Sequence, residues 1–371
     1  MRYLGMDVHL KAIVYCLLDC TGQTVERGEI ETTVPALQKL VRRLRETDEL
    51  VVGQEVGKLS YLVHDAVTET GTKILSFNAW QLRMIAASRK KTDKRDAYWI
   101  AKSLQTGMTP TPVYIPTGEV RQLRALLSRR QALVSERVRW LLRSRSFLQA
   151  AGYKPPRGHR SVMKIIEAGV NSPDGIDETL AQSLELCHRM HAAASIELAR
   201  LDATLHQHAE RIEIVQRLQT IPAVGERLAL LLHAWIGDVS RFRSARELAS
   251  YAGLVPSVHQ SGTTGRNGTI TRMGSPQLRS ALVQSGHVLL WRCKAEESLP
   301  LKAIPLRVQT SRGRRKIAVV AAARHILRIA FYVMRDGTSY DPKRLPSPSE
   351  PQLAPAIAAA PLLETAAAPA S

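Results

Sequence analysis

Residues 2–8 of the chain read Arg-Tyr-Leu-Gly-Met-Asp-Val, and residues 11–18 read Lys-Ala-Ile-Val-Tyr-Cys-Leu-Leu. Both stretches are rich in apolar and β-branched residues, which predicts two strands, and Asp19-Cys20-Thr21-Gly22 predicts the turn that follows them. The same reasoning and the spacing of apolar residues predict further strands over 23–32, 50–55 and 73–77 and helices over 35–47 and 59–70.

The predicted order is three strands, a helix, a strand, a helix and a strand. This is the order of the ribonuclease-H-like (RuvC-like) α/β fold, although strand–helix alternation alone also fits many other α/β proteins. We therefore expect residues 1–115 to form an α/β domain of the ribonuclease-H-like class.

After residue 115 the apolar spacing becomes helical. Leucine and valine recur at helical spacing over 119–150 and 178–217, which predicts a helical hairpin or coiled coil within 116–217. A mainly helical C-terminal domain is expected over 218–335. The segment 336–371 is expected to be a disordered tail, because its end is dominated by Ala, Pro and Ser.

The composition favours a polyanionic partner. The chain has 52 Lys and Arg against 33 Asp and Glu, a formal net charge of +19, and the phosphate backbone of nucleic acid is the commonest polyanion in the cytosol. Eight arginines on the predicted helix 119–150 favour nucleic acid further, with a solvated charged face as the alternative. No apolar run of eighteen residues and no early signal-like stretch is present, so a cytoplasmic, nucleoid-associated protein is expected.

Four carboxylates form a candidate metal site. Asp7 follows one apolar strand and Glu55 ends another, while Asp93 and Asp96 open a predicted helix and share one of its faces. Hard divalent cations prefer oxygen ligands, and such ions activate an attacking oxygen at phosphorus. Taken singly, each acid also fits a helix-dipole or surface position. Together, in a strongly basic chain, they predict a Mg²⁺ site.

Two C-terminal stretches carry further hypotheses. Residues 218–226, Leu-Gln-Thr-Ile-Pro-Ala-Val-Gly-Glu, are similar to a helix–hairpin–helix turn, whose backbone N–H groups can bind phosphate. Ala223 stands where the first glycine is usual, so phosphate binding and a simple tight turn are both open. Ser261 lies in a Gly- and Thr-rich loop among arginines, but a serine hydroxyl needs activation before it attacks phosphorus, so a polar loop without catalytic function is the alternative.

Four motifs together resemble the transposases of the insertion sequence 110/1111 family, over about residues 1–335. They are Gly5-Met6-Asp7, Glu55-Val56-Gly57, Lys91-Thr92-Asp93-Lys94-Arg95-Asp96-Ala97 and Gly253-Leu254-Val255-Pro256 followed after four residues by Ser261-Gly262. The resemblance implies a RuvC-like domain with an Asp-Glu-Asp-Asp site, so that Asp7, Glu55, Asp93 and Asp96 would bind Mg²⁺. It also implies a serine nucleophile, with Ser261 expected and Ser257 as the second candidate.

The family resemblance further implies a DNA recombinase that moves its own element, guided by a structured (bridge) RNA and acting as a dimer or tetramer. The alternative enzyme is a Holliday-junction-type endonuclease that uses metal-activated water. A nucleic-acid-binding protein without catalysis is a third possibility, which the four intact acids disfavour. The predicted nucleic-acid contacts are Arg89, Lys90, Lys91, Arg129, Arg130, Arg137, Arg266, Arg272, Arg279, Arg314 and Arg315.

Overall fold

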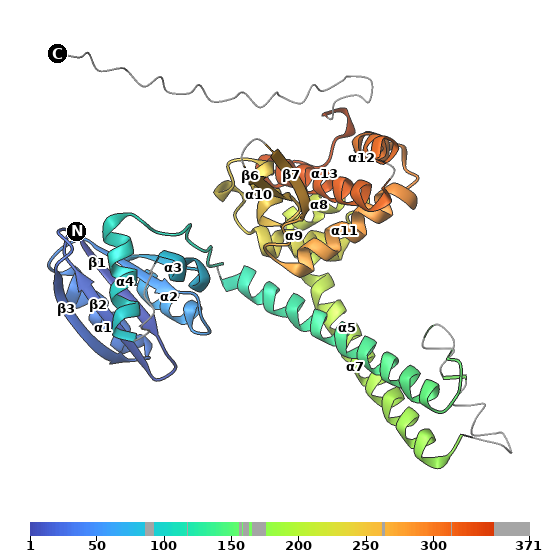
Figure 1. Cartoon of the computed structure of the whole chain (residues 1–371), viewed down its shortest axis with the longest axis horizontal. Helices are drawn as coiled ribbons and strands as arrows, with labels where there is room; N and C mark the ends of the chain where they lie inside the picture. The colour runs from blue at the N-terminus through green and yellow to red at the C-terminus, as the bar shows by residue number, and fades with distance from the viewer. Residues whose placement is uncertain are drawn as a thin grey trace. The chain divides into compact units, whose positions relative to one another are not determined.

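The protein divides into two compact units, Met1–Thr117 and Gly118–Ser371 (Figure 1). The computed structural model describes residues 1–85, 93–116, 118–155, 158, 163–164, 176–261, 264–312 and 314–344. The predicted division of the second unit at residue 217 stays a prediction.

A five-stranded mixed sheet forms the centre of the first unit. Its strands are β1 (Arg2–Val8), β2 (Ala12–Leu18), β3 (Thr24–Glu31), β4 (Leu50–Glu55) and β5 (Lys73–Phe77), in the order β3-β2-β1-β4-β5. The first three strands pair antiparallel, whereas β1, β4 and β5 run parallel. This topology confirms the ribonuclease-H-like fold class predicted from the order of elements.

Helices cover both faces of this sheet (Figure 1). Helices α1 (Val34–Arg45) and α2 (Ser60–Thr68) pack on the face that buries Leu4, Met6 and Val52. Helices α3 (Ala79–Ile85) and α4 (Asp93–Thr106) pack on the opposite face. Because side chains alternate along a strand, the odd-numbered residues of β1 and β4 face α4.

Two glycines allow α4 to lie directly on the sheet. A Cβ atom at Gly5 would lie 2.1 Å from the carbonyl oxygen of Ala97 and 2.4 Å from the backbone nitrogen of Ala101. A Cβ atom at Gly53 would meet the side chains of Ile100 and Leu104, at 2.7 Å and 2.8 Å. Backbone-to-backbone contact at Gly5 therefore fixes the height of α4 above β1.

Two long antiparallel helices begin the second unit. Helix α5 (Gly118–Ala150) and helix α7 (Glu178–Arg211) lie side by side (Figure 1). Leu148, at the end of α5, packs with Leu180 and Leu184 at the start of α7, which establishes the antiparallel pairing. The helical hairpin predicted from the leucine spacing is confirmed.

The remainder of the second unit is mainly helical. Its elements are α8 (Glu213–Gln219), α9 (Glu226–Ile236), η1 (Val239–Arg241), α10 (Ala245–Tyr251), β6 (Pro256–Ser261), β7 (Thr264–Ile270), α11 (Pro276–Trp291), η2 (Glu296–Ser298), α12 (Leu299–Arg312), α13 (Arg315–Asp336) and η3 (Pro342–Arg344). Helix α13 is long and apolar enough to span a membrane, but 61% of its most apolar window is buried inside the fold. It is therefore the core helix against which α10, α11 and α12 pack.

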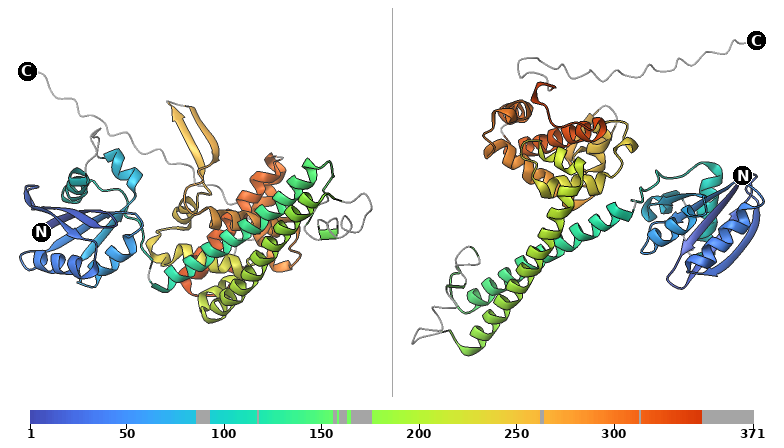
Figure 2. Two further views of the ribbon diagram at one scale, coloured as in Figure 1. Left: turned by 90° about the horizontal axis from the view of Figure 1, so that it is seen from below. Right: turned by 180° about the vertical axis from the view of Figure 1, so that it is seen from behind.

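The structure differs from the sequence-based prediction at two places in this unit. Residues around Ser261, predicted as a loop, form the hairpin β6–β7, which projects from the helices (Figure 2). Its polar, Gly-containing strands lack the apolar alternation by which a strand is recognised. The packed structure also extends past residue 336, because the Tyr340 hydroxyl donates to the Glu297 carbonyl at 2.8 Å. Residues 345–371 lie outside the described part of the chain.

The contact at Gly5 gives a first prediction. The substitution Gly5→Ala is expected to lower the free energy of unfolding by about 3 kcal/mol, because the new methyl group meets rigid backbone rather than a movable side chain. Gly57→Ala is the matched control, since a Cβ atom there meets nothing within 4 Å, and its effect should stay within about 0.5 kcal/mol. Equal urea-unfolding midpoints for the two variants would contradict this account of the helix–sheet contact.

Candidate functional site

Asp7 and Glu55 occupy neighbouring positions at the carboxyl edge of the sheet. In the parallel pair β1–β4, Gly5 is in register with Gly53 and Met6 with Gln54, so Asp7 and Glu55 follow next. Each acid lies two residues after a glycine that contacts α4, and both therefore belong to the sheet face that α4 covers.

Helix α4 begins at the same edge of the sheet. Its later residue Gln105 donates to the carbonyl of Cys20 at 3.1 Å, and Cys20 follows the end of β2, beside the start of β1. Helix α4 therefore runs antiparallel to β1, which brings its first turn, with Asp93 and Asp96, towards the edge where β1 and β4 end. The fold thus brings the strand ends that carry Asp7 and Glu55, and the start of α4, towards one edge of the sheet.

Asp7 lies in a partly enclosed environment. Its side chain is 15% exposed, and its Oδ2 lies 3.2 Å from Nε2 of His9, which is 49% exposed. The turn between β1 and β2 positions His9, whose backbone N–H donates to the Ala12 carbonyl at 3.0 Å. Sequence reasoning missed His9. Its position two residues after Asp7 is the signal that could have revealed it.

The oxygen donors at this edge fit a hard divalent cation by their chemistry. Within the described part of the chain, however, no three His, Cys, Asp or Glu side chains are close enough together to hold a metal ion. The side chain of Asp93 lies outside that part. The ligand set Asp7, Glu55, Asp93 and Asp96 therefore stays a prediction.

The hairpin β6–β7 carries both candidate serines. Ser261 is the last residue of β6 and is paired with Thr264, the first residue of β7, while its side chain lies outside the described part. Ser257 lies where the register shifts between Pro256 and Val258, and its Oγ donates to the Thr269 carbonyl at 3.0 Å. The Ser257 hydroxyl is thus engaged within the hairpin.

Two backbone loops lock together at the base of this hairpin. A Cβ atom at Gly253 would lie 2.1 Å from the Met273 carbonyl oxygen, and one at Gly274 would lie 2.0 Å from that of Tyr251. The Arg272 backbone N–H also donates to the Gly253 carbonyl at 3.2 Å. Arg272 has φ +57, a left-handed conformation that is uncommon for arginine. The motif Gly253-Leu254-Val255-Pro256 therefore leads into β6, and its first residue packs backbone to backbone against the segment that follows β7.

The predicted nucleic-acid contacts fall into three groups. Arg89, Lys90 and Lys91 lie outside the described residues, as does the side chain of Arg266. Arg129, Arg272, Arg314 and Arg315 are exposed, and Arg137 and Arg279 are half-buried. Arg130 differs, because its guanidinium forms two hydrogen bonds to Asp202 of α7, at 2.5 Å and 3.1 Å. All eleven residues remain predicted nucleic-acid contacts. The positive charge of Arg130 is already balanced by the carboxylate of Asp202.

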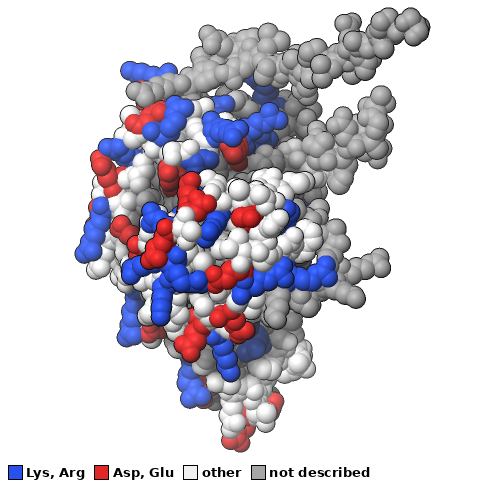
Figure 3. All heavy atoms as spheres, turned by 90° about the vertical axis from the view of Figure 1, so that its left-hand side faces the viewer, with Lys and Arg blue, Asp and Glu red and all other residues white. Residues whose placement is uncertain are grey.

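Some arginines of α5 stabilise the fold instead. The Arg124 side chain donates through Nε to the Ala234 carbonyl at 2.7 Å and through Nη2 to the Trp235 carbonyl at 3.2 Å. These carbonyls belong to the last turn of α9, where no further backbone N–H of the helix is available to donate to them. Figure 3 shows Lys and Arg interspersed with Asp and Glu on the face that it displays. The net charge of +19 therefore does not produce a uniformly basic surface on this face.

The turn between α8 and α9 contains a strained alanine. Ala223 has φ +67, the left-handed conformation for which glycine is usual, and its carbonyl accepts a hydrogen bond from the Ser285 hydroxyl. Glu226 already places an acid in the first turn of α9, 2.6 Å from Nδ1 of His206, whose pKa its hydrogen bond and charge raise. Of the two alternatives left open by the sequence, the structure contains the tight turn between the helices. Phosphate binding by this turn stays a prediction.

Comparison with protein families identifies the class to which this fold and site belong. Residues 4–152 match the DEDD transposase family model of IS110 elements, and residues 215–300 match the Transposase IS116/IS110/IS902 family. The chain belongs to the IS110 family of transposases, enzymes that transfer DNA strands. Transposases act on DNA, and the DEDD class is typically metal-dependent.

Individual relatives agree with this assignment. A putative transposase of Sinorhizobium fredii is 29% identical, over 72% of this chain and 70% of the relative. The transposase for insertion sequence element IS1328 of Yersinia enterocolitica is 28% identical, over 61% and 66%. The pilin gene-inverting protein of Moraxella lacunata is 26% identical, over 91% and 97%.

A stability measurement tests the structural role of Arg124. Arg124→Met keeps the aliphatic stem but removes both hydrogen bonds to the end of α9, so it is expected to lower the free energy of unfolding by about 2 kcal/mol. Arg129→Met, at an exposed position of the same helix, is the control and should change it by less than about 0.5 kcal/mol. If the two variants unfold at the same denaturant concentration, Arg124 is a surface charge only.

Proposed function

We propose that the chain is a DNA recombinase that excises and integrates its own insertion sequence, guided by a structured non-coding RNA. Asp7, Glu55, Asp93 and Asp96 hold Mg²⁺ in this proposal, and Ser261 attacks the DNA phosphodiester. The observation that carries it is the meeting of two adjacent strand ends and the first turn of α4 at one edge of a ribonuclease-H-like sheet.

The acids and their neighbours have distinct tasks at this edge. Mg²⁺, when bound, would supply positive charge that orients the scissile phosphate and stabilises the oxygen leaving it. The rigid contact of Gly5 with α4 holds Asp7 and Asp96 at a set separation, which preorganises the ligands. His9, 3.2 Å from Asp7, orients that carboxylate from the solvent side.

The serine step has a simple atom balance. The Ser261 Oγ forms a bond to phosphorus, its proton leaves to a base or water, and the bond from phosphorus to one DNA strand breaks to give a free hydroxyl. The hydroxyl of a different strand then attacks the same phosphorus and gives up its proton, the bond from phosphorus to the Ser261 Oγ breaks, and Ser261 takes up a proton as the new strands are joined. The position of Ser261 at the far end of the hairpin supports this role, because it lies away from the packed base at Gly253 and Gly274.

The partners follow from the same proposal. They are double-stranded DNA at the element ends and target, the guide RNA, and further copies of the chain in a dimer or tetramer, in the cytoplasm at the nucleoid. The relative from Moraxella lacunata, named for inverting a pilin gene, supports recombination, since an inversion also requires DNA strands to be cut and rejoined.

Covalent trapping tests the choice of nucleophile. Protein, guide RNA, element-junction DNA and Mg²⁺ are mixed, denatured and resolved by electrophoresis to detect DNA joined to protein. Ser261→Ala is expected to abolish the adduct, whereas Ser257→Ala should retain it and lower stability by only about 1 kcal/mol through the lost hydrogen bond to Thr269. The reverse pattern would transfer the role of nucleophile to Ser257.

Removal of the metal ligands tests the carboxylate site. Asp7→Asn, or a chelator added to the parent protein, is expected to reduce adduct formation by at least about 100-fold, with recovery of the chelated sample on addition of Mg²⁺. Glu31→Gln, an exposed acid on the edge strand of the same sheet, serves as the control. Cleavage that requires Asp7 but yields no adduct would instead indicate an endonuclease that uses metal-activated water.

A further inference from the structure

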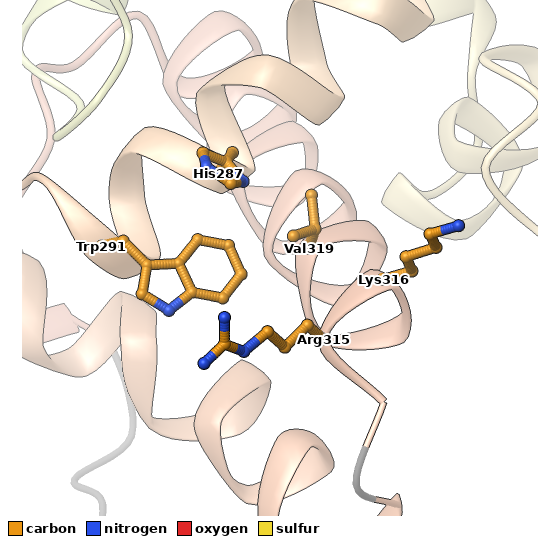
Figure 4. Close-up of a pocket in the computed structure, with 5 residues that line it drawn as sticks. All are labelled: His287, Trp291, Arg315, Lys316 and Val319. Atoms are coloured by element: carbon orange, nitrogen blue, oxygen red, sulfur yellow. The ribbon is translucent and has the colours of Figure 1, made fainter.

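A cavity of about 320 Å³ opens between α11 and α13, inside the second unit. Its lining combines an aromatic side and a basic side (Figure 4). The lining residues are His287, Trp291, Arg315, Lys316 and Val319. None of the five is acidic, and neither the carboxylate edge nor the serine hairpin includes any of them.

The packing of the two helices creates this cavity. A Cβ atom at Gly286 would lie 2.6 Å from the Val319 carbonyl oxygen, so α11 and α13 cross in close contact there. His287 and Trp291 are four residues apart on α11, as are Arg315 and Val319 on α13, and each pair therefore shares a helix face. The close crossing holds the two faces together, with the buried Val319 as an apolar wall.

The aromatic side is a stacking platform. Trp291, at the end of α11, is 39% exposed, and the His287 ring lies 4.5 Å from its indole between centroids, tilted by 53°. A tryptophan exposed to this degree leaves apolar surface in water, at a cost in free energy. A flat, apolar ligand placed on the indole would remove that cost.

The basic side lies at the positive end of a helix dipole. Arg314, Arg315 and Lys316 follow one another at the start of α13, and Arg314, the N-cap residue, forms no side-chain cap. An arginine has no acceptor to offer to the first N–H groups, and cations are unfavourable at a helix N-terminus. Three positive charges therefore lie together at the beginning of a core helix. An anion bound there would compensate their mutual repulsion and their unfavourable interaction with the helix dipole. The guanidinium of Arg315 extends towards the Trp291 indole (Figure 4).

We propose that this cavity binds one unpaired nucleotide of a nucleic-acid strand. The base stacks on Trp291 beside His287, and its phosphate contacts Arg315 and the N–H groups that begin α13. A base within a duplex has both faces covered by its neighbours, so only a nucleotide outside the stack can use the platform. The proposal rests on the proposed function, in which the chain handles nucleic acid, and adds a site for strands that are not fully paired.

The test measures binding of duplexes that carry one bulged nucleotide. Full-length protein is titrated with a fluorescent DNA duplex bearing a bulged adenosine, with the same duplex bearing an abasic residue at the bulge, and with the fully paired duplex. The same three ligands are made in RNA, so that the two sources of an unpaired nucleotide are distinguished. The parent protein is expected to bind the bulged adenosine about tenfold more tightly than the abasic bulge in at least one of the two series.

Variants assign that preference to the cavity. Trp291→Ala should remove the tenfold preference while leaving affinity for the paired duplex unchanged, and Trp291→Phe should keep most of it because a ring remains. Trp80→Ala replaces another exposed tryptophan, in the first unit, and should not alter the preference. Arg315→Gln should reduce the slope of log affinity against log salt by about 1, the effect of one phosphate contact. The control for charge is Arg200→Gln on α7, whose guanidinium already pairs with Glu197.

The outcomes are separable from those of the proposed function. A preference for the bulged base that survives in Trp291→Ala, or no preference in the parent protein in either DNA or RNA, overturns the proposed nucleotide site. Neither result bears on the serine adduct, which is measured separately with junction DNA. Conversely, a protein that forms no adduct can still show the Trp291-dependent preference, in which case the site stands and the recombination mechanism fails.

Discussion

The contact between the backbone of β1 and the backbone of α4 at Gly5 is the constraint on which the first unit depends. Without a side chain at this position, the carbonyl of Ala97 and the N–H of Ala101 lie directly over the strand. A helix held by backbone contact has little freedom to slide, because no flexible side chain can absorb a shift. The ends of β1 and β4 and the start of α4 are consequently held together by backbone contact and do not move as three independent parts.

The positive charge of the chain serves two purposes that composition does not distinguish. Arg124 and Arg130, which sequence reasoning counted with a nucleic-acid-binding face, are hydrogen-bonded to the end of α9 and to Asp202 respectively. Arg129 and Arg315, by contrast, are exposed to solvent. Arginines that hold helices together are less available to bind the phosphates of a nucleic acid, so the net charge overstates the number of such contacts.

The sequence allowed the α/β class, the order of its strands and the helical hairpin to be predicted, since each depends on local apolar spacing. The gathering of Asp7 and Glu55 at one edge was also predictable, because parallel strands end at the same edge. The hairpin β6–β7 was not, as its strands are polar and are held by the interlocked loops at Gly253 and Gly274. The contact of His9 with Asp7 and the cavity beside Trp291 both depend on tertiary packing that spacing does not encode.

The basic start of α13 has a consequence for the stability of the whole second unit. Helix α13 is its core, with residues from Ala318 to Val333 buried against the surrounding helices. A ligand that binds the folded unit and not the unfolded chain shifts the folding equilibrium by mass action. An anion bound at the first turn of α13, as proposed, would therefore stabilise the core of the unit as well as occupy its surface. If nucleic acid occupies this site as proposed, its binding and the resistance of the unit to unfolding are thermodynamically linked, and each strengthens the other.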